Sequence, residues 1–113
     1  MNMPLIIAHR GASAFAPENT MAAFRLAKEL GADGIELDVM LSADGKLVVI
    51  HDQSVERTSN GQGKVNEMSW NELGALDAGS KFDIRFNGEP LPQLEQVFEE
   101  LGGHFLINVE LKN

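Results

Sequence analysis

The alternation of apolar and acidic residues is clearest in segment 34–39, which has the sequence Gly-Ile-Glu-Leu-Asp-Val. This period of two predicts a strand that buries its apolar face and presents Glu36 and Asp38 together on the other face. Two carboxylates on one buried face repel each other unless they share a proton or a cation. The pattern therefore fits either a site for a hard divalent cation or an edge strand with a solvated acidic face.

The residues before this strand predict another strand and a helix. The apolar run 5–8 is typical of a strand buried on both faces of a parallel sheet, and it leads directly into His9 and Arg10. Apolar residues at three-residue steps predict an amphipathic helix over about 20–30, with Asn19 as its N-cap. A strand–helix–strand unit favours an α/β fold with parallel strands.

The residues after the acidic strand allow two pairings. Segment 42–45 is a turn signal, and the apolar run 47–50 predicts a further strand. A hairpin closed between Leu41 and Lys46 would place Glu36 opposite His51. A crossover without a helix would keep the strands parallel, with their polar ends at one rim. Both arrangements bring His51 close to the carboxylates.

The remainder of the chain predicts an irregular excursion followed by a helix and a strand. Segment 54–88 is rich in Gly, Asn and Ser, but residues 69–72 have capping-box spacing and predict a short helix through Leu76. Residues 94–101 have apolar positions at the i, i+3, i+4, i+7 spacing of an amphipathic helix. Segment 105–112 predicts the last strand.

The composition predicts a single small soluble domain. The 113 residues are 43% hydrophobic and 23% charged, and 9 Lys and Arg against 17 Asp and Glu give a net charge of −8. This charge argues against nucleic acid or an anionic membrane as the main partner. There is no cysteine, no apolar run of membrane-spanning length and no recognisable signal peptide at residues 1–8, so we expect a cytoplasmic protein.

The predicted strands all end in, or carry, groups that can bind ions or move protons. In parallel α/β folds, functional sites are built at the carboxyl ends of the strands, so we expect these groups to meet there. The groups are His9 and Arg10, Glu36 and Asp38, His51 and Asp52, and Glu110 and Lys112.

Eight ordered motifs match one protein family. They are His-Arg-Gly at 9–11, Pro-Glu-Asn-Thr at 17–20, Glu-Leu-Asp-Val at 36–39, His-Asp at 51–52, Arg-Thr at 57–58, Asn-Gly at 60–61, Gly-Glu-Pro-Leu-Pro at 88–92 and Asn-Val-Glu-Leu-Lys at 108–112. With these motifs the chain resembles the glycerophosphodiester phosphodiesterases over nearly its whole length. The resemblance implies a TIM-barrel-type fold and metal-dependent hydrolysis of glycerophosphodiesters to an alcohol and glycerol 3-phosphate, a reaction of lipid metabolism.

The resemblance also implies roles for seven residues. It implies three carboxylates on a divalent metal, Mg or Ca, two imidazoles as the acid–base pair, and two cations that hold the phosphate. The metal-binding carboxylates would be Glu36, Asp38 and Glu110. The acid–base pair would be His9 and His51, and the phosphate would be held by Arg10 and Lys112. The sequence leaves open which histidine is the acid and whether water or the neighbouring glycerol hydroxyl attacks.

Three further polar residues are expected to be structural. Strand alternation turns Asp52 away from the face of His51, so we expect it to have no catalytic role. Glu18 and Asn19 are expected to order their loop and cap the helix rather than to touch substrate.

About four of the eight strands of a barrel are predicted, so the chain is expected to form the N-terminal half-barrel as one domain, 1–113, with a small insertion at 54–92. An alternative is a catalytically silent half-barrel that keeps the metal site and serves in assembly. A related barrel phosphodiesterase acting on phosphoinositides is disfavoured by the acidic charge. The apolar edges 5–8 and 105–109 predict a homodimer or higher oligomer that closes the barrel.

Overall fold

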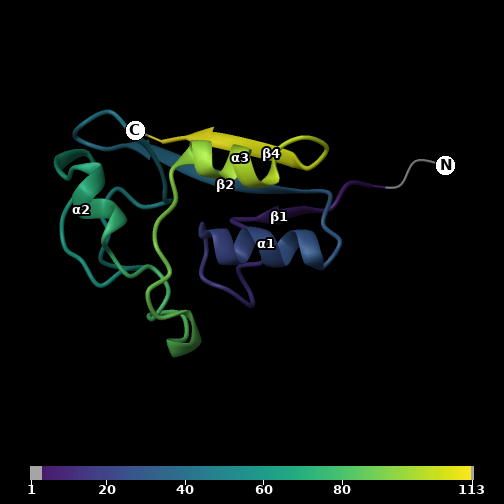
Figure 1. Cartoon of the computed structure of the whole chain (residues 1–113), viewed down its shortest axis with the longest axis horizontal. Coiled ribbons are helices and arrows are strands. Elements are labelled where there is room, and N and C mark those ends of the chain that lie inside the picture. The colour runs from purple at the N-terminus through teal and green to yellow at the C-terminus, as the bar shows by residue number, and fades with distance from the viewer. Residues whose placement is uncertain (1–3, 113) are drawn as a thin grey trace.

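The structure, a computed structural model, describes residues 4–112 (Figure 1). Its elements in chain order are β1 Ile7–His9, α1 Met21–Glu29, β2 Gly34–Leu41, β3 Leu47–Val49, the 3-10 turn η1 Val65–Glu67, α2 Trp70–Gly74, the 3-10 turn η2 Ile84–Phe86, α3 Leu94–Leu101 and β4 Leu106–Leu111.

Strand β2 is the centre of the sheet. It pairs in parallel with β1 and with β4 and antiparallel with β3. Val39 has Val49 as its partner in β3 and Leu111 as its partner in β4, so β3 and β4 lie on opposite edges of β2. Strands β1 and β3 therefore pair with the same edge of β2, β1 with its first residues and β3 with its last.

The pairing that the sequence left open is thus a hairpin, but its register differs by one residue from the one considered above. The ladder closes with Leu41 opposite Leu47, and it ends with Val39 opposite Val49. His51 consequently lies beyond the paired residues and is not opposite Glu36. The extra loop residue is accommodated by a turn in which the Ser42 hydroxyl accepts a hydrogen bond from the Lys46 amide at 2.9 Å.

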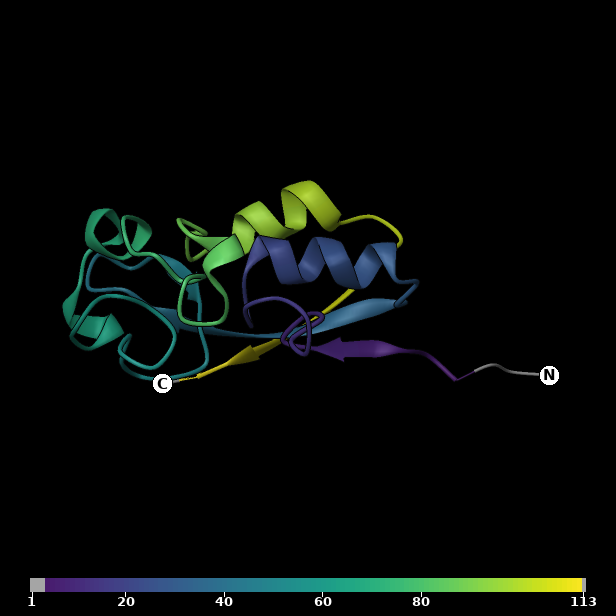
Figure 2. The ribbon, with the colours of Figure 1, turned by 90° about the horizontal axis from the view of Figure 1, so that it is seen from below.

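Helices α1 and α3 lie side by side on one face of the sheet (Figure 2). The face of β2 formed by Ile35, Leu37 and Val39 packs against them and contacts Phe24 of α1 and Val97 of α3, among other buried residues. This confirms the predicted apolar face of β2. Because side chains alternate, Glu36 and Asp38 are directed to the face that the helices leave open.

A second apolar core lies under segment 54–92. Met40, Val48 and Ile50 of the hairpin pack against buried residues of this segment. Those residues are Val55, Val65, Leu73, Ala78 and Leu91. They are too widely spaced to give a period in the sequence, which is why the segment appeared irregular. The capping box predicted at the start of α2 is present, with Ser69 as the N-cap and Glu72 as its partner.

Two local predictions were wrong. The N-cap of α1 is Thr20, whose hydroxyl accepts from the Ala23 amide at 3.2 Å, and Asn19 instead has φ 56° and is directed at the polar face of β2. The run 5–8 is not buried on both faces, because Leu5 and Ile6 are 65% and 62% exposed. In the described residues β1 has only β2 as a partner, so its other edge is unpaired, and the exposure of Ile7 and His9 shows that one of its faces is uncovered.

The close contact of β2 with β4 depends on a glycine. A Cβ placed on Gly34 would lie 2.3 Å from the Leu106 carbonyl oxygen, whereas a Cβ on Gly31 would have nothing within 4 Å. We predict that Gly34→Ala destabilises the fold by about 2 kcal/mol. Gly31→Ala should cost about 1–2 kcal/mol through its left-handed backbone alone.

Hydrogen exchange separates the two variants. Gly34→Ala should remove the protection of the β4 amides from Leu106 to Leu111, while Gly31→Ala should preserve it. Equal protection of β4 in both variants would show that this contact does not control the pairing.

Candidate functional site

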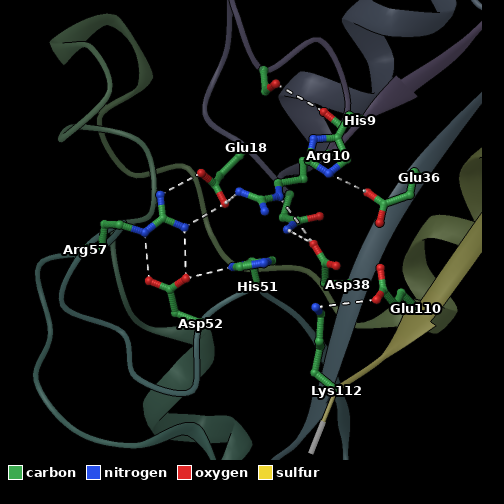
Figure 3. A network of polar contacts seen from close by, with 12 residues as sticks. His9, Arg10, Glu18, Glu36, Asp38, His51, Asp52, Arg57, Glu110 and Lys112 are labelled. Carbon is green, nitrogen blue, oxygen red and sulfur yellow. Dashed lines mark hydrogen bonds and ion pairs between the residues drawn. The ribbon is translucent and has the colours of Figure 1, made fainter.

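Three carboxylates meet on the open face of the sheet (Figure 3). Glu36 and Asp38 come from β2 and Glu110 from β4, and each offers an oxygen within 4.8 Å of the other two. Asp38 and Glu110 are partners in the parallel ladder, so the sheet itself sets their separation. Asp38 is only 1% exposed. Carboxylate oxygens are the ligands that hard divalent cations prefer, so this group could hold such a cation.

The environment of Glu36 supports this assignment. Burial, and then the charge of Asp38, raise the pKa of the Glu36 carboxyl. Its Oε1 atom is buried and accepts no hydrogen bond from the described residues. A buried carboxylate oxygen without a donor is costly, and a cation among the three carboxylates would compensate it. The residues therefore fit a divalent metal.

A strained loop brings one hydrogen-bond donor and one positive charge to Asp38. Arg10 and Asn19 both have left-handed backbones, with φ 57° and 56°, and the Asn19 amide donates to the Arg10 carbonyl at 2.9 Å. The Asn19 side-chain amide donates to Asp38 Oδ2 at 3.1 Å, and Arg10 Nε lies 3.5 Å from the same oxygen. A left-handed backbone at a non-glycine residue lowers the free energy of unfolding by about 1–3 kcal/mol, so the placement of these two side chains destabilises the loop.

His9 and Lys112 flank the carboxylates on neighbouring strands. His9 is the ladder partner of Glu36, and its Nε2 lies 3.6 Å from Glu36 Oε1. Lys112 follows β4, and its Nζ lies 3.5 Å from Glu110 Oε1. The imidazole of His9 is largely exposed, so it is accessible to a ligand bound at this face.

His51 reaches the site from the end of the hairpin, and Asp52 contacts it. Asp52 Oδ1 lies 2.9 Å from His51 Nδ1, so the expectation that Asp52 points away from His51 was wrong. The physical reason is that β3 ends at Val49. The strict alternation of a strand does not extend to residues 51 and 52. Figure 3 shows the His51 ring between Asp52 and the carboxylate cluster.

Arg57 joins Asp52 to Glu18. Its guanidinium donates to Asp52 at 2.7 and 3.0 Å and to Glu18 at 2.8 and 3.0 Å. The hydrogen bond from Arg57, with a second one from His51, lowers the pKa of Asp52 to about 2. Burial acts to raise the pKa of Glu18, but the hydrogen bond and charge of Arg57 outweigh it and lower the pKa overall. Glu18 also accepts from Arg10 Nη1 at 3.3 Å.

The structure thus brings the seven residues singled out in the sequence to one face or its margin. Sequence analysis missed the contacts of Asn19 with Asp38 and of Arg57 with both Glu18 and Asp52. Asn19 and Arg57 lie inside motifs quoted above, but no periodicity or spacing in the sequence assigns them a partner.

The family model of the glycerophosphoryl diester phosphodiesterases matches residues 9–113. The chain belongs to this family. It is 57% identical over 110 residues to a glycerophosphodiester phosphodiesterase of Caldanaerobacter subterraneus, covering 96% of this chain and 45% of that protein. The crystal structure of a glycerophosphodiester phosphodiesterase from Agrobacterium tumefaciens superimposes with a TM-score of 0.96 at 52% identity, covering 98% of this chain and 48% of that one.

A phosphodiesterase of Oleispira antarctica, solved with the product sn-glycerol-3-phosphate, is also similar, with a TM-score of 0.92 and 41% identity over 97% of this chain and 45% of that one. The chain therefore spans about half the length of the relatives it matches. These structures confirm the predicted fold class, an α/β sheet of the TIM-barrel type of which the chain forms about the first half. Among the described residues no helix is long and apolar enough to cross a membrane.

The acid sensitivity of the fold tests the Arg57 network. The pKa of Asp52 is about 2 in the folded protein against 3.8 ordinarily, so ionised Asp52 stabilises the fold above about pH 4. This stabilisation is lost as the pH falls through the folded pKa. We predict that Asp52→Asn lowers the free energy of unfolding by about 1–2 kcal/mol at pH 7. The deficit relative to wild type should shrink as the pH approaches 2.

Urea unfolding at pH 7, 4 and 3 measures this. The matched control is Glu29→Gln, which neutralises an exposed carboxylate at the end of α1. A deficit for Asp52→Asn that is the same at all three pH values would contradict the network as described.

Proposed function

We propose that the chain carries the metal and acid–base centre of a glycerophosphodiester phosphodiesterase, which hydrolyses glycerophosphodiesters to an alcohol and glycerol 3-phosphate. The observation that carries the proposal is the set of three carboxylates with oxygens within 4.8 Å of one another. Two imidazoles, of His9 and His51, and two cationic side chains lie around them. The product bound by the Oleispira antarctica relative supports this class of substrate.

In this proposal Glu36, Asp38 and Glu110 hold one divalent cation, Mg²⁺ or Ca²⁺. When bound, such a cation neutralises charge on the phosphodiester and favours loss of a proton by the attacking oxygen. Among the residues of the chain, Arg10 presents a planar fork suited to phosphate oxygens, and Lys112 adds a compact positive charge. The two cations compensate the anionic substrate locally in a chain whose net charge is −8.

His9 and His51 are the proposed acid–base pair. The leaving alcohol needs a proton, and the attacking hydroxyl, from water or from the neighbouring glycerol, must lose one. Imidazoles change protonation near neutral pH, so one histidine can remove the first proton and the other can deliver the second. His9 belongs to β1 and His51 follows β3, and in Figure 3 both lie near the carboxylates of β2.

A second candidate function is that of a catalytically silent assembly module. It is favoured by exposed apolar residues at the margins of the sheet. Leu5, Ile6 and Leu106 are 65%, 62% and 46% exposed, respectively. Large exposed apolar surface favours association, so we propose a homodimer or higher oligomer for the chain in either case. Hydrolysis of glycerophosphocholine that a chelator abolishes would separate the enzyme from the silent module. The cytoplasmic location stays a prediction.

We predict that the carboxylate cluster binds one divalent cation per chain. Titration calorimetry with Mg²⁺ and with Ca²⁺ should show one site in the wild type and a loss of affinity of at least about tenfold in Glu36→Gln. The control Glu99→Gln neutralises an exposed carboxylate on α3 and should bind like the wild type. Equal binding by wild type and Glu36→Gln would exclude the site as drawn.

We also predict that His9→Ala and His51→Ala each lower the turnover of a glycerophosphodiester by about 10²–10⁴. Metal affinity in the same calorimetric assay should change little, because neither imidazole is a proposed ligand. The control His104→Ala replaces an exposed histidine before β4 and should keep its activity. Turnover close to that of the wild type in either site variant would remove that histidine from the acid–base pair.

A further inference from the structure

We propose that Arg57 is a positioning residue for the reaction: it holds Asp52 in the orientation in which Asp52 fixes the tautomer and ring plane of His51. The inference rests on the proposed function, because it assigns a role to a residue that acts through His51. Arg57 itself is not among the carboxylates, imidazoles and cations proposed to meet metal or substrate.

The geometry of Arg57 is that of a double clamp. Nε and Nη2 donate to the two oxygens of Asp52 at 2.7 and 3.0 Å, and Nη1 and Nη2 donate to the two oxygens of Glu18 at 2.8 and 3.0 Å. A guanidinium is planar with its donors fixed in a fork, so holding one carboxylate orients the plane that holds the other. Half of the Arg57 side chain is exposed, so these contacts, rather than burial, fix its position.

Asp52, held in this way by Arg57, in turn orients the ring of His51. Asp52 Oδ1 lies 2.9 Å from His51 Nδ1, and an ionised carboxylate can only accept hydrogen bonds. Neutral His51 must therefore carry its proton on Nδ1, since the bond at one ring nitrogen decides the tautomer. Nε2 is left with a free lone pair to accept a proton from a reacting group. Without Arg57, the Asp52 carboxylate would lose the two hydrogen bonds that Arg57 donates to it.

The clamp also crosses three separate parts of the chain. Glu18 lies in the loop between β1 and α1, Asp52 follows β3, and Arg57 lies within segment 54–92. Glu18 Oε2 accepts from both Arg57 and Arg10. One carboxylate thus connects the residue that positions His51 to a residue proposed to hold the phosphate. A change at Arg57 is expected to disturb the orientation of His51 more than the fold, whose two apolar cores contain none of these side chains.

Nitrogen-15 NMR of the histidine rings tests the proposal directly in the full chain. There are three histidines, so the His51 signals can be assigned by comparison with His9→Gln and His104→Gln. At a pH where His51 is neutral, the wild type should show the Nδ1–H tautomer. Arg57→Met and the more conservative Arg57→Gln should shift His51 to a mixture of the two neutral tautomers.

The chain offers a matched control in Arg25, which makes a two-pronged contact with Glu100 at 2.5 and 2.7 Å between α1 and α3. Arg25→Met removes a comparable ion pair away from His51 and should leave its tautomer unchanged. If Arg57→Met does not fold, the test uses Arg57→Gln, provided that the dispersion of its NMR spectrum shows that it is folded. The wild-type tautomer in a folded Arg57 variant overturns the proposal.

Kinetics supply a second readout. Loss of positioning should lower kcat for a glycerophosphodiester by about 10–100-fold with little change in KM, because the group that orients an acid–base residue acts on the chemical step. An unchanged kcat overturns the proposal. If the wild type hydrolyses nothing while the tautomer still depends on Arg57, the positioning of His51 is supported and the proposed function alone is contradicted.

Discussion

The repulsion among three carboxylates on one side of the sheet is the constraint around which the site is built. The parallel ladder of β2 and β4 places Asp38 beside Glu110, and strand alternation places Glu36 on the same face. At Asp38, Arg10 offsets part of the negative charge and the Asn19 side-chain amide donates a hydrogen bond. Both residues of the loop have left-handed backbones. Glu36 Oε1 accepts no hydrogen bond from the described residues, although His9 Nε2 lies 3.6 Å away, so a cation among the three carboxylates would stabilise it further.

The length of β2 links this cluster to the other functional groups. β2 continues beyond the residues that pair with β1, and its extension pairs with β3 in a hairpin that returns the chain toward the carboxylates. His51 follows that hairpin, and the second apolar core fastens segment 54–92 to it. The same packing therefore supports both His51, the proposed acid–base residue, and segment 54–92, which contains Arg57.

Local patterns predicted most of the fold. The alternation in 34–39, the spacing in 94–101 and the capping box at Ser69 depend on neighbours in sequence, and the structure shows each of them. What the sequence did not predict are contacts between distant loops: Glu18 and Arg57 are 39 positions apart and neither lies in a periodic segment. The hairpin register and the exposure of 5–8 depend on loop geometry and on which elements cover a strand, which periodicity does not encode.

Anomalous diffraction from crystals soaked in Mn²⁺ tests the central claim most directly. Mn²⁺ accepts the same oxygen ligands as Mg²⁺ and is identified by its anomalous signal. The account predicts one peak among Glu36, Asp38 and Glu110, with carboxylate oxygens at about 2.0–2.3 Å, and no peak there in Glu36→Gln crystals. A well-ordered trio of carboxylates with no peak between them at saturating Mn²⁺ would contradict it.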